Sequence, residues 1–350
     1  MAMHQLGIIG YGGMAAYHYR EMPKPDNLRF VAACDISETR RELANSEGLT
    51  VYQDYNELLN DPAIEAVLIA VPNNLHFSMA RAALDHGKHV ICEKPATMTS
   101  DEFKQLMDIA QQKKLLLTCH QNRRMDEDFL IIQKLANDGE LGEVFRIESR
   151  VEGSRGIADT WRRKKEFGGG MLYDWGSHLI DQMLLLTPGS VTSVFMRRQQ
   201  LLPLDVDDNF RLELEFDTGL SALIEIGTCN FIMHPIWYVL GRKGSAQIDY
   251  WDMSGKVVTL TNENIKWEDE IRPNIVGPSI TMAPRASDTV ATNPLPKVQP
   301  DKGFFYRNFS RALDGIEPLC VQPSQTLRVM KIIDLAFASA EQNQVFHCNI

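Results

Sequence analysis

Short apolar runs alternate with segments of helical spacing through the first 120 residues. We predict strands at 5–9, 28–34, 50–52, 66–71, 89–92 and 115–119, and helices between them at 14–21, 38–47, 55–59, 75–86 and 100–113. Strands that are buried on both faces read as continuous apolar runs, so this alternation predicts an α/β domain with a doubly wound parallel sheet. Ligands of such sheets bind at the carboxyl ends of the strands.

The pattern changes after residue 121. Residues 210–216 alternate apolar and charged side chains, which indicates a sheet with one apolar and one charged face. With further strands predicted at 144–151, 191–197, 220–228 and 237–241, the second half forms an α+β domain with a mainly antiparallel sheet and helices on its apolar face. We place the first domain at 1–121 and the second at 122–350, closed by helices at 304–313 and 326–342. Six prolines in 273–300 predict a long extended loop.

A glycine-rich turn joins the first predicted strand to the first helix. In Gly10-x-Gly12-x-x-Ala15, Gly10 permits the tight turn, Gly12 lets the backbone approach a pyrophosphate, and Ala15 keeps the helix close to the strand. Asp35 ends the second strand, where a carboxylate can bind a ribose 2′-hydroxyl. This order of elements predicts dinucleotide binding. Because Asp35 would repel a 2′-phosphate, we expect NAD rather than NADP, and Arg40 and Arg41 weaken that preference slightly.

Composition excludes several other classes of function. The chain has 36 Lys and Arg against 46 Asp and Glu, a net charge of −10, and no basic cluster with aromatics, so nucleic acid is not an expected partner. Apolar runs such as 66–71 are too short to cross a membrane. The first residues do not have the pattern of a signal peptide, and the six cysteines are scattered without a C-x-x-C motif. We therefore expect a cytoplasmic protein without disulfides or a metal site.

Polar residues in two otherwise apolar regions are candidates for chemistry. Lys94 follows a buried strand and is held by Pro95, although without other context an ion pair with Glu93 that caps the strand is the favoured explanation, since most lysines are surface charges. Asp174 and His178 stand at i and i+4 of a predicted helix with Asp181 at i+7, which puts all three on one face. A satisfied surface pair is the alternative, but the helix is largely apolar, and buried polar groups need partners or a function.

These motifs together resemble the glucose–fructose oxidoreductase/inositol dehydrogenase/rhizopine catabolism (Gfo/Idh/MocA) family, essentially end to end. The matching residues are Gly10-x-Gly12-x-x-Ala15, Gly87 to Val90, Glu93-Lys94-Pro95, Gly168-Gly169-Gly170 and Asp174-x-x-x-His178-x-x-Asp181. The resemblance implies a Rossmann domain, a second domain with an open, mostly antiparallel sheet that often forms an oligomer interface, and NAD(P)-linked oxidation or reduction of sugars and polyols. It also implies that Lys94, Asp174 and His178 are catalytic.

We name two further sets of site residues. The expected cofactor-binding residues are Gly10, Tyr11, Gly12, Gly13, Met14, Ala15, Asp35, Ile36, Val71, Pro72, Asn73, His76, Glu93, Lys94, Pro95 and Asn122. An aromatic face and hydrogen-bonding cations suit a polyhydroxylated ring, so the expected substrate-binding residues are His120, Arg123, Trp161, Arg162, Arg163 and Tyr173.

The expected reaction transfers a hydride between a secondary alcohol of a sugar, polyol or glycoside and the nicotinamide. Lys94 would stabilise the developing alkoxide. His178 would titrate in a pH range that suits uptake of the hydroxyl proton, and Asp174 would orient its imidazole. Whether Lys94 or His178 takes the proton directly stays open at this point.

Two other functions compete with this dehydrogenase. The first is an enzyme that retains NAD and oxidises a sugar transiently to permit elimination or glycoside cleavage. The second is a non-catalytic NAD-binding regulator, which would not need Lys94, Asp174 and His178. The uncovered charged face of 210–228 predicts a homodimer or homotetramer, although a solvent-facing sheet would show the same alternation.

Overall fold

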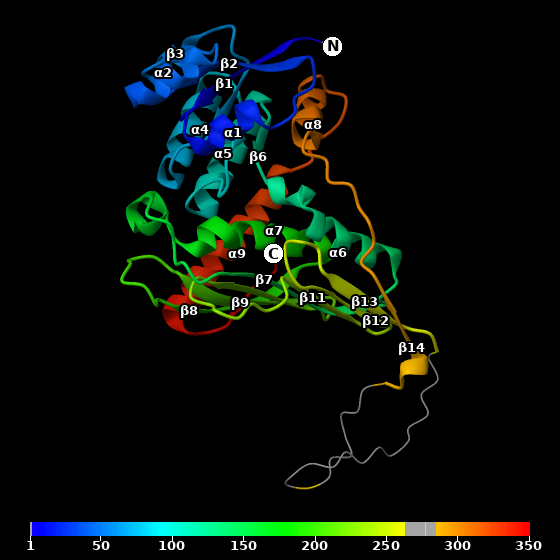
Figure 1. Cartoon of the computed structure of the whole chain (residues 1–350). Coiled ribbons are helices and arrows are strands. Elements are labelled where there is room, and N and C mark those ends of the chain that lie inside the picture. The colour runs from blue at the N-terminus through cyan, green and yellow to red at the C-terminus, as the bar shows by residue number, and fades with distance from the viewer. Residues whose placement is uncertain (1, 263–276, 278–284) are drawn as a thin grey trace.

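The computed structural model describes residues 2–262, 277 and 285–350, and its elements form two bodies (Figure 1). Each body is organised around its own sheet, of six strands in the first and nine in the second. In Figure 1 the first body lies above and the sheet of the second body below, with helices α6 (Glu127–Asp138), α7 (Ser177–Leu186) and α9 (Pro323–Gln342) between the two sheets.

The first sheet is parallel throughout and has the order β3-β2-β1-β4-β5-β6. Its strands are β1 (His4–Ile9), β2 (Leu28–Cys34), β3 (Thr50–Tyr52), β4 (Ala66–Ile69), β5 (His89–Cys92) and β6 (Leu117–Cys119), and its helices are α1 (Gly13–Arg20), α2 (Glu38–Ser46), α3 (Tyr55–Asn60), α4 (His76–Asp85) and α5 (Ser100–Lys113). The doubly wound parallel sheet is thus confirmed. Its strand order reverses between β1 and β4, where such sheets bind their ligands.

The second sheet has the order β14-β13-β12-β11-β7-β10-β9-β8-β15. The strands that the sequence predicts are β7 (Val144–Glu152), β8 (Val191–Gln199), β9 (Asn209–Phe216), β10 (Ser221–Gly227) and β11 (Trp237–Gly241). The pair β7–β10 is parallel and the other pairs are antiparallel, so the mostly antiparallel sheet is confirmed. In β9, Leu212 and Leu214 are buried while Arg211 and Glu213 are exposed, which is the predicted alternation. An oligomer contact through this charged face stays a prediction.

Four strands at the two edges of the second sheet were not expected. They are β12 (Gly244–Ile248), β13 (Gly255–Leu260), β14 (Val290–Asn293) and β15 (Phe346–His347). These strands are short and lack a clear apolar alternation, because they gain their structure mainly from the neighbours with which they pair, and β14 and β15 are the edges of the sheet. The expectation of a continuous loop over 273–300 is wrong at β14. The parts of that loop at 273–276 and 278–284 lie outside the described residues.

Helix α8 (Phe304–Leu313) returns the chain to the first body (Figure 1). Its Tyr306 hydroxyl bonds the buried ring of His18, and the hydroxyl of Ser310 donates to Asn27 at 3.0 Å. The predicted closing helix therefore packs on the first sheet rather than on the second. The division of the chain at residue 121 stays a prediction.

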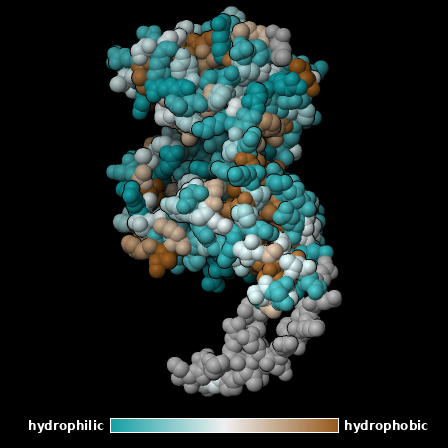
Figure 2. All heavy atoms as spheres, turned by 45° about the vertical axis from the view of Figure 1, so that its right-hand side comes forward, coloured by the Kyte–Doolittle hydropathy of each residue, from teal (hydrophilic) through white to brown (hydrophobic). Residues whose placement is uncertain are grey.

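The surface in Figure 2 is largely hydrophilic, with separate brown apolar patches and a hollow between the two bodies. In the described part of the chain, no helix is both long and apolar enough to cross a bilayer.

Candidate active site

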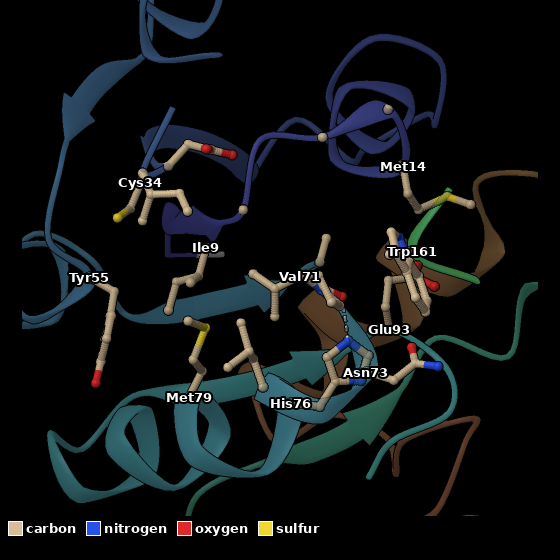
Figure 3. A pocket seen from close by; sticks show the side chains of 18 of the residues that line it. Ile9, Met14, Cys34, Tyr55, Val71, Asn73, His76, Met79, Glu93 and Trp161 are labelled. Atoms are coloured by element: carbon tan, nitrogen blue, oxygen red, sulfur yellow. Dashed lines mark hydrogen bonds between the residues drawn. The ribbon is translucent and has the colours of Figure 1, made fainter. Parts of the chain in front are cut away.

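A cavity of about 470 Å³ lies at the carboxyl ends of the first sheet and reaches the second body. Figure 3 shows Cys34 and Tyr55 at one end and Met14 and Trp161 at the other, with Val71 and His76 between them. The first end is built from strand ends of one body, whereas Trp161 comes from the other body. We call the end at Cys34 and Tyr55 the nucleotide end of the cleft, and the end at Trp161 the reacting end.

The nucleotide end begins at the glycine turn between β1 and α1. Gly10 has φ +88°, and a Cβ there would lie 2.6 Å from Val71 Cγ1, so neither the backbone conformation nor the space suits a larger residue. A Cβ on Gly12 or Gly13 would meet no atom within 4 Å. Both line the cavity at the amino end of α1, where free amide groups favour an anion. These residues fit the pyrophosphate of a dinucleotide.

Asp35 lies beside this turn and lines the same cavity. Its Oδ2 accepts the Tyr11 amide at 2.7 Å and its Oδ1 accepts the Ser37 amide at 2.8 Å. The carboxylate is thus held by two backbone donors and keeps further lone pairs for a ribose hydroxyl. Arg41 donates to the carbonyls of Asp35 and Ile36, so its guanidinium stabilises the same turn.

The reacting end joins the two bodies through Lys94 and Asp174. Lys94 Nζ donates to Asp174 Oδ1 at 2.7 Å and to the Asp174 carbonyl at 2.9 Å, and Arg162 Nε lies 3.4 Å from the same carboxylate oxygen. Burial opposes ionisation of Asp174, but Lys94 and Arg162 outweigh it and hold the pKa of this carboxyl below its usual value. Lys94 therefore contacts the second body. This contact favours a role in the chemistry over the other explanation, an ion pair with Glu93 that caps the strand.

The triple glycine fixes Arg162 in place. Gly170 N–H donates to the Arg162 carbonyl at 3.0 Å, and a Cβ on Gly169 would lie 2.2 Å from that carbonyl oxygen. Asn73, at the end of β4, donates to the Gly168 carbonyl at 2.8 Å. The backbone passes this close because no side chain intervenes, and the loop consequently ties the Arg162 segment to the cofactor cavity.

His178 is buried near this pair without a hydrogen bond to it. The helical face expected for 174–181 is interrupted, because Asp174 belongs to the π-helical segment η5 (Leu172–Gly176) that precedes α7. Asp174 is bonded to Lys94 instead, and Nδ1 of His178 has no partner among the described residues. Orientation of His178 by Asp174 is therefore a wrong expectation. Burial, followed by the charges of Lys94 and Arg123, lowers the pKa of His178 well below its usual value, which keeps the ring neutral.

Glu93 supports Lys94 from beneath through a buried network. Its Oε1 accepts from His18 Nε2 at 2.7 Å and from His120 Nδ1 at 2.8 Å, and His18 Nδ1 contacts the Tyr306 hydroxyl. Although burial alone would raise the pKa of Glu93, His120 and His18 hold it well below its usual value. The network joins α1, β5, the end of β6 and α8, and so fixes the strand end that carries Lys94.

Most of the expected cofactor residues lie together. Those that line the cavity are Gly10, Gly12, Gly13, Met14, Asp35, Ile36, Val71, Pro72, Asn73, His76, Glu93 and Lys94, joined by Trp161, Arg162 and Asp174. Tyr11, Ala15 and Pro95 are buried behind this surface, so they support the cavity instead of lining it.

The structure separates several residues that we grouped by sequence. Tyr173 donates to the Met98 carbonyl and lines a different cavity, so its assignment to the substrate pocket is corrected. Asp181 pairs with Arg124 at 2.6 Å and has a structural role. Arg163 donates to the carbonyl of Ile157. Asn122, His120 and Arg123 line a second cavity rather than the cofactor cavity.

Sequence reasoning missed part of the nucleotide end. The lining residues that we did not name there are Ile9, Cys34, Gln53, Tyr55, Ala70, Leu75 and Met79. Gln53 and Tyr55 directly follow β3, so the rule that ligands bind at the carboxyl ends of strands could have found them. Met79 lies on α4, and no local motif indicates it.

Comparisons with known proteins agree with this architecture. Residues 4–121 match the family described as "Oxidoreductase family, NAD-binding Rossmann fold", and residues 129–247 match the GFO/IDH/MocA C-terminal domain. The structure of an NAD-binding protein from Listeria innocua has a TM-score of 0.94 and 41% identity, and the match covers 99% of this chain and 100% of that one.

Two relatives match most of this chain. Uncharacterized oxidoreductase C115.03 of Schizosaccharomyces pombe is 43% identical over 310 residues, 84% of each chain. The scyllo-inositol 2-dehydrogenase (NADP(+)) IolW of Bacillus subtilis is 30% identical over 350 residues, 97% of this chain and 94% of that protein. With both family domains matched in order, the chain belongs to the Gfo/Idh/MocA family of oxidoreductases, which have an NAD(P)-binding Rossmann fold.

Proposed function

We propose that the protein is an NAD-dependent dehydrogenase that transfers a hydride between the nicotinamide and a secondary alcohol of a sugar, polyol or glycoside. The observation that carries this proposal is the Lys94–Asp174 pair, which closes the cofactor cavity at the junction of the two bodies. A bound nicotinamide would supply the hydride acceptor. The glycine turn and Asp35 would hold its nucleotide.

Lys94 acts on the substrate as a fixed positive charge. Its side chain is 10% exposed and is held by two oxygens of Asp174, so its ammonium is positioned before a substrate binds. Such a group stabilises the negative charge that develops on the hydroxyl oxygen as the proton leaves.

His178 is the proton acceptor in this proposal. A base must be unprotonated before it can accept, and burial together with the charges of Lys94 and Arg123 keeps the ring neutral by lowering its pKa. Among the residues that the structure describes, Nδ1 of this ring has no hydrogen-bond partner, which supports a role outside the structural network. Asp174 positions Lys94 instead of the imidazole.

A panel of inositols, sugars and glycosides tests the proposal when NADH absorbance is followed with the full chain and NAD. We expect turnover with at least one polyhydroxylated alcohol and release of NADH in proportion to substrate consumed. Substrate consumption without free NADH would overturn the proposal in favour of an enzyme that retains NAD. Binding of NAD with no turnover across the panel would contradict a dehydrogenase of this class.

A further inference from the structure

A second cavity, of about 430 Å³, lies next to the reacting end of the cleft. Glu93 lines the cofactor cavity, His120 lines the second one, and a 2.8 Å hydrogen bond joins these two residues. The walls come from residues 120–128 after β6, from the turn at Trp251 and from the segment 300–305 that leads into α8. Both bodies therefore contribute to this cavity.

Its wall carries polar atoms that the protein leaves unpaired. Seven buried side-chain atoms lack a hydrogen-bond partner among the described residues, and three belong to residues of this cavity: His120 Nε2, Gln121 Oε1 and Arg123 Nε. His120 and Gln121 are only 1% and 4% exposed, so these atoms have lost water without gaining a protein partner. That loss is unfavourable for each atom unless a ligand or water supplies a bond.

The unpaired atoms define the chemistry of a partner. Gln121 Oε1 is an acceptor, and Nδ1 of His120 is bonded to Glu93, so Nε2 is the ring nitrogen of His120 that is left for a ligand. The Gln121 acceptor, this ring nitrogen and the Arg123 donor suit hydroxyl groups, which both donate and accept.

The charged and apolar side chains of the cavity restrict the chemical class of the ligand further. The charged side chains on the wall are Arg123, Arg124 and Lys302 on one side and Asp126, Glu127, Asp128 and Asp301 on the other. Three cations against four acids leave no excess of positive charge, which disfavours a phosphate or a sugar acid. Trp251 is 41% exposed at the rim and offers a flat apolar face to the C–H side of a ring.

The cavity is also linked to the reacting groups. The guanidinium of Arg123 stacks 3.9 Å from the ring centre of Trp175, the neighbour of Asp174, and that ring lies 6.2 Å from His178. His178 is thus close to Arg123 of the second cavity and to Lys94 of the first.

We propose that the second cavity holds the non-reacting hydroxyls of a neutral polyol, which pair with Gln121 and His120 while Trp251 covers the ring. This inference rests on the proposed function, and it adds Gln121 and Trp251 as substrate-positioning residues. Because a site that hydrogen-bonds hydroxyl groups rejects analogues that lack them, the pocket would select for the number of hydroxyls.

Calorimetry with the full chain and saturating NAD tests the site, with myo-inositol, scyllo-inositol, sorbitol and D-glucose as probes. We expect at least one probe to bind saturably, and its Kd to rise about tenfold or more in Gln121→Met and in Trp251→Leu. The matched controls Gln112→Met and Phe231→Leu replace exposed residues that do not line this cavity and should keep the wild-type Kd.

A deoxy analogue of the bound probe sharpens the test for Gln121. Removal of the hydroxyl that pairs with Gln121 weakens binding to the wild type but has little further effect in Gln121→Met, so the two changes are not additive. An unchanged Kd in both Gln121→Met and Trp251→Leu, or no saturable binding of any probe to the wild type, would overturn the inference. If a probe binds with the expected variant effects but yields no NADH, the proposed function fails while the cavity assignment stands.

Discussion

The two ends of the cofactor cleft are built in different ways. The nucleotide end is centred on one continuous unit, residues 10–35, whose glycine turn, helix and strand-end acid follow each other along the chain. The reacting end pairs Lys94 with Asp174, which is 80 residues away and belongs to the other body. Binding of the dinucleotide thus depends on local backbone geometry, whereas the chemistry depends on how the two bodies dock.

Lys94→Ala should separate the two ends most clearly. Loss of the ammonium removes the charge that stabilises an alkoxide, so we expect turnover to fall by about two to four orders of magnitude. The Kd for NAD should change little, because the contacts of the nucleotide end are intact. The exposed Lys104→Ala is the matched control. Near-normal turnover in Lys94→Ala would remove the reacting end from the mechanism.

Acid should weaken the network that supports the reacting end. Burial, together with the nearby His120, lowers the pKa of His18 from its usual 6.5 to about 4. Between pH 6.5 and 4 the unfolded chain binds a proton at His18 and the folded chain does not. The stability that neutral His18 contributes is therefore present above pH 6.5 and is lost as the pH falls toward 4. His18 alone contributes about 3 kcal/mol to the free energy of unfolding above pH 6.5.

Urea unfolding at several pH values measures this loss. His18→Asn should flatten the slope of unfolding free energy between pH 6.5 and 4, whereas the exposed His347→Asn should leave it unchanged. A slope that is equal in His18→Asn and wild type would contradict the assignment of a neutral His18.

Two glycine substitutions test whether the nucleotide end is a local unit. Gly10→Ala should destabilise the fold by about 2 kcal/mol, because φ is +88° and the new Cβ would lie 2.6 Å from Val71 Cγ1. Gly12→Ala meets no protein atom within 4 Å, so it should keep the stability but weaken NAD binding about tenfold by crowding the pyrophosphate. Thermal unfolding and NAD titration distinguish the two effects. Equal effects of both variants on stability would refute this division.

Asp35→Ser should produce the smallest change, a shift of about tenfold in the NAD/NADP preference toward NADP. The carboxylate is held at the turn by the amides of Tyr11 and Ser37, so its charge faces the ribose position. Titration of both cofactors against wild type and variant measures the shift. The relative IolW is described as NADP(+)-dependent, and tighter binding of NADP by the wild type here would show that Asp35 does not decide the preference.

The same comparison explains how much could be predicted from the sequence. Strands β2, β3 and β5 match their predicted limits, and for the mostly buried β2 and β5 the reason is that buried parallel strands leave apolar runs. The short strands β12 to β15 were missed because pairing with their neighbours, rather than their own side chains, makes them strands. The helical periodicity placed Asp174 and His178 on one face. In the structure, however, Asp174 lies in a π-helical segment and accepts a hydrogen bond from Lys94 rather than from His178.

By itself, the sequence determined the parallel sheet, the glycine turn and the position of Asp35. Each depends on properties that act over a few residues: apolar burial, the steric freedom of Gly10 and the place where a strand ends. Only the tertiary structure decided that Lys94 pairs with Asp174 and that α8 returns to support Glu93 through Tyr306 and His18. It also decided that Gln121 Oε1, beside a second cavity, has no partner among the described residues. These contacts join residues far apart along the chain, and the packing of the two bodies, which no local pattern encodes, brings them within bonding distance.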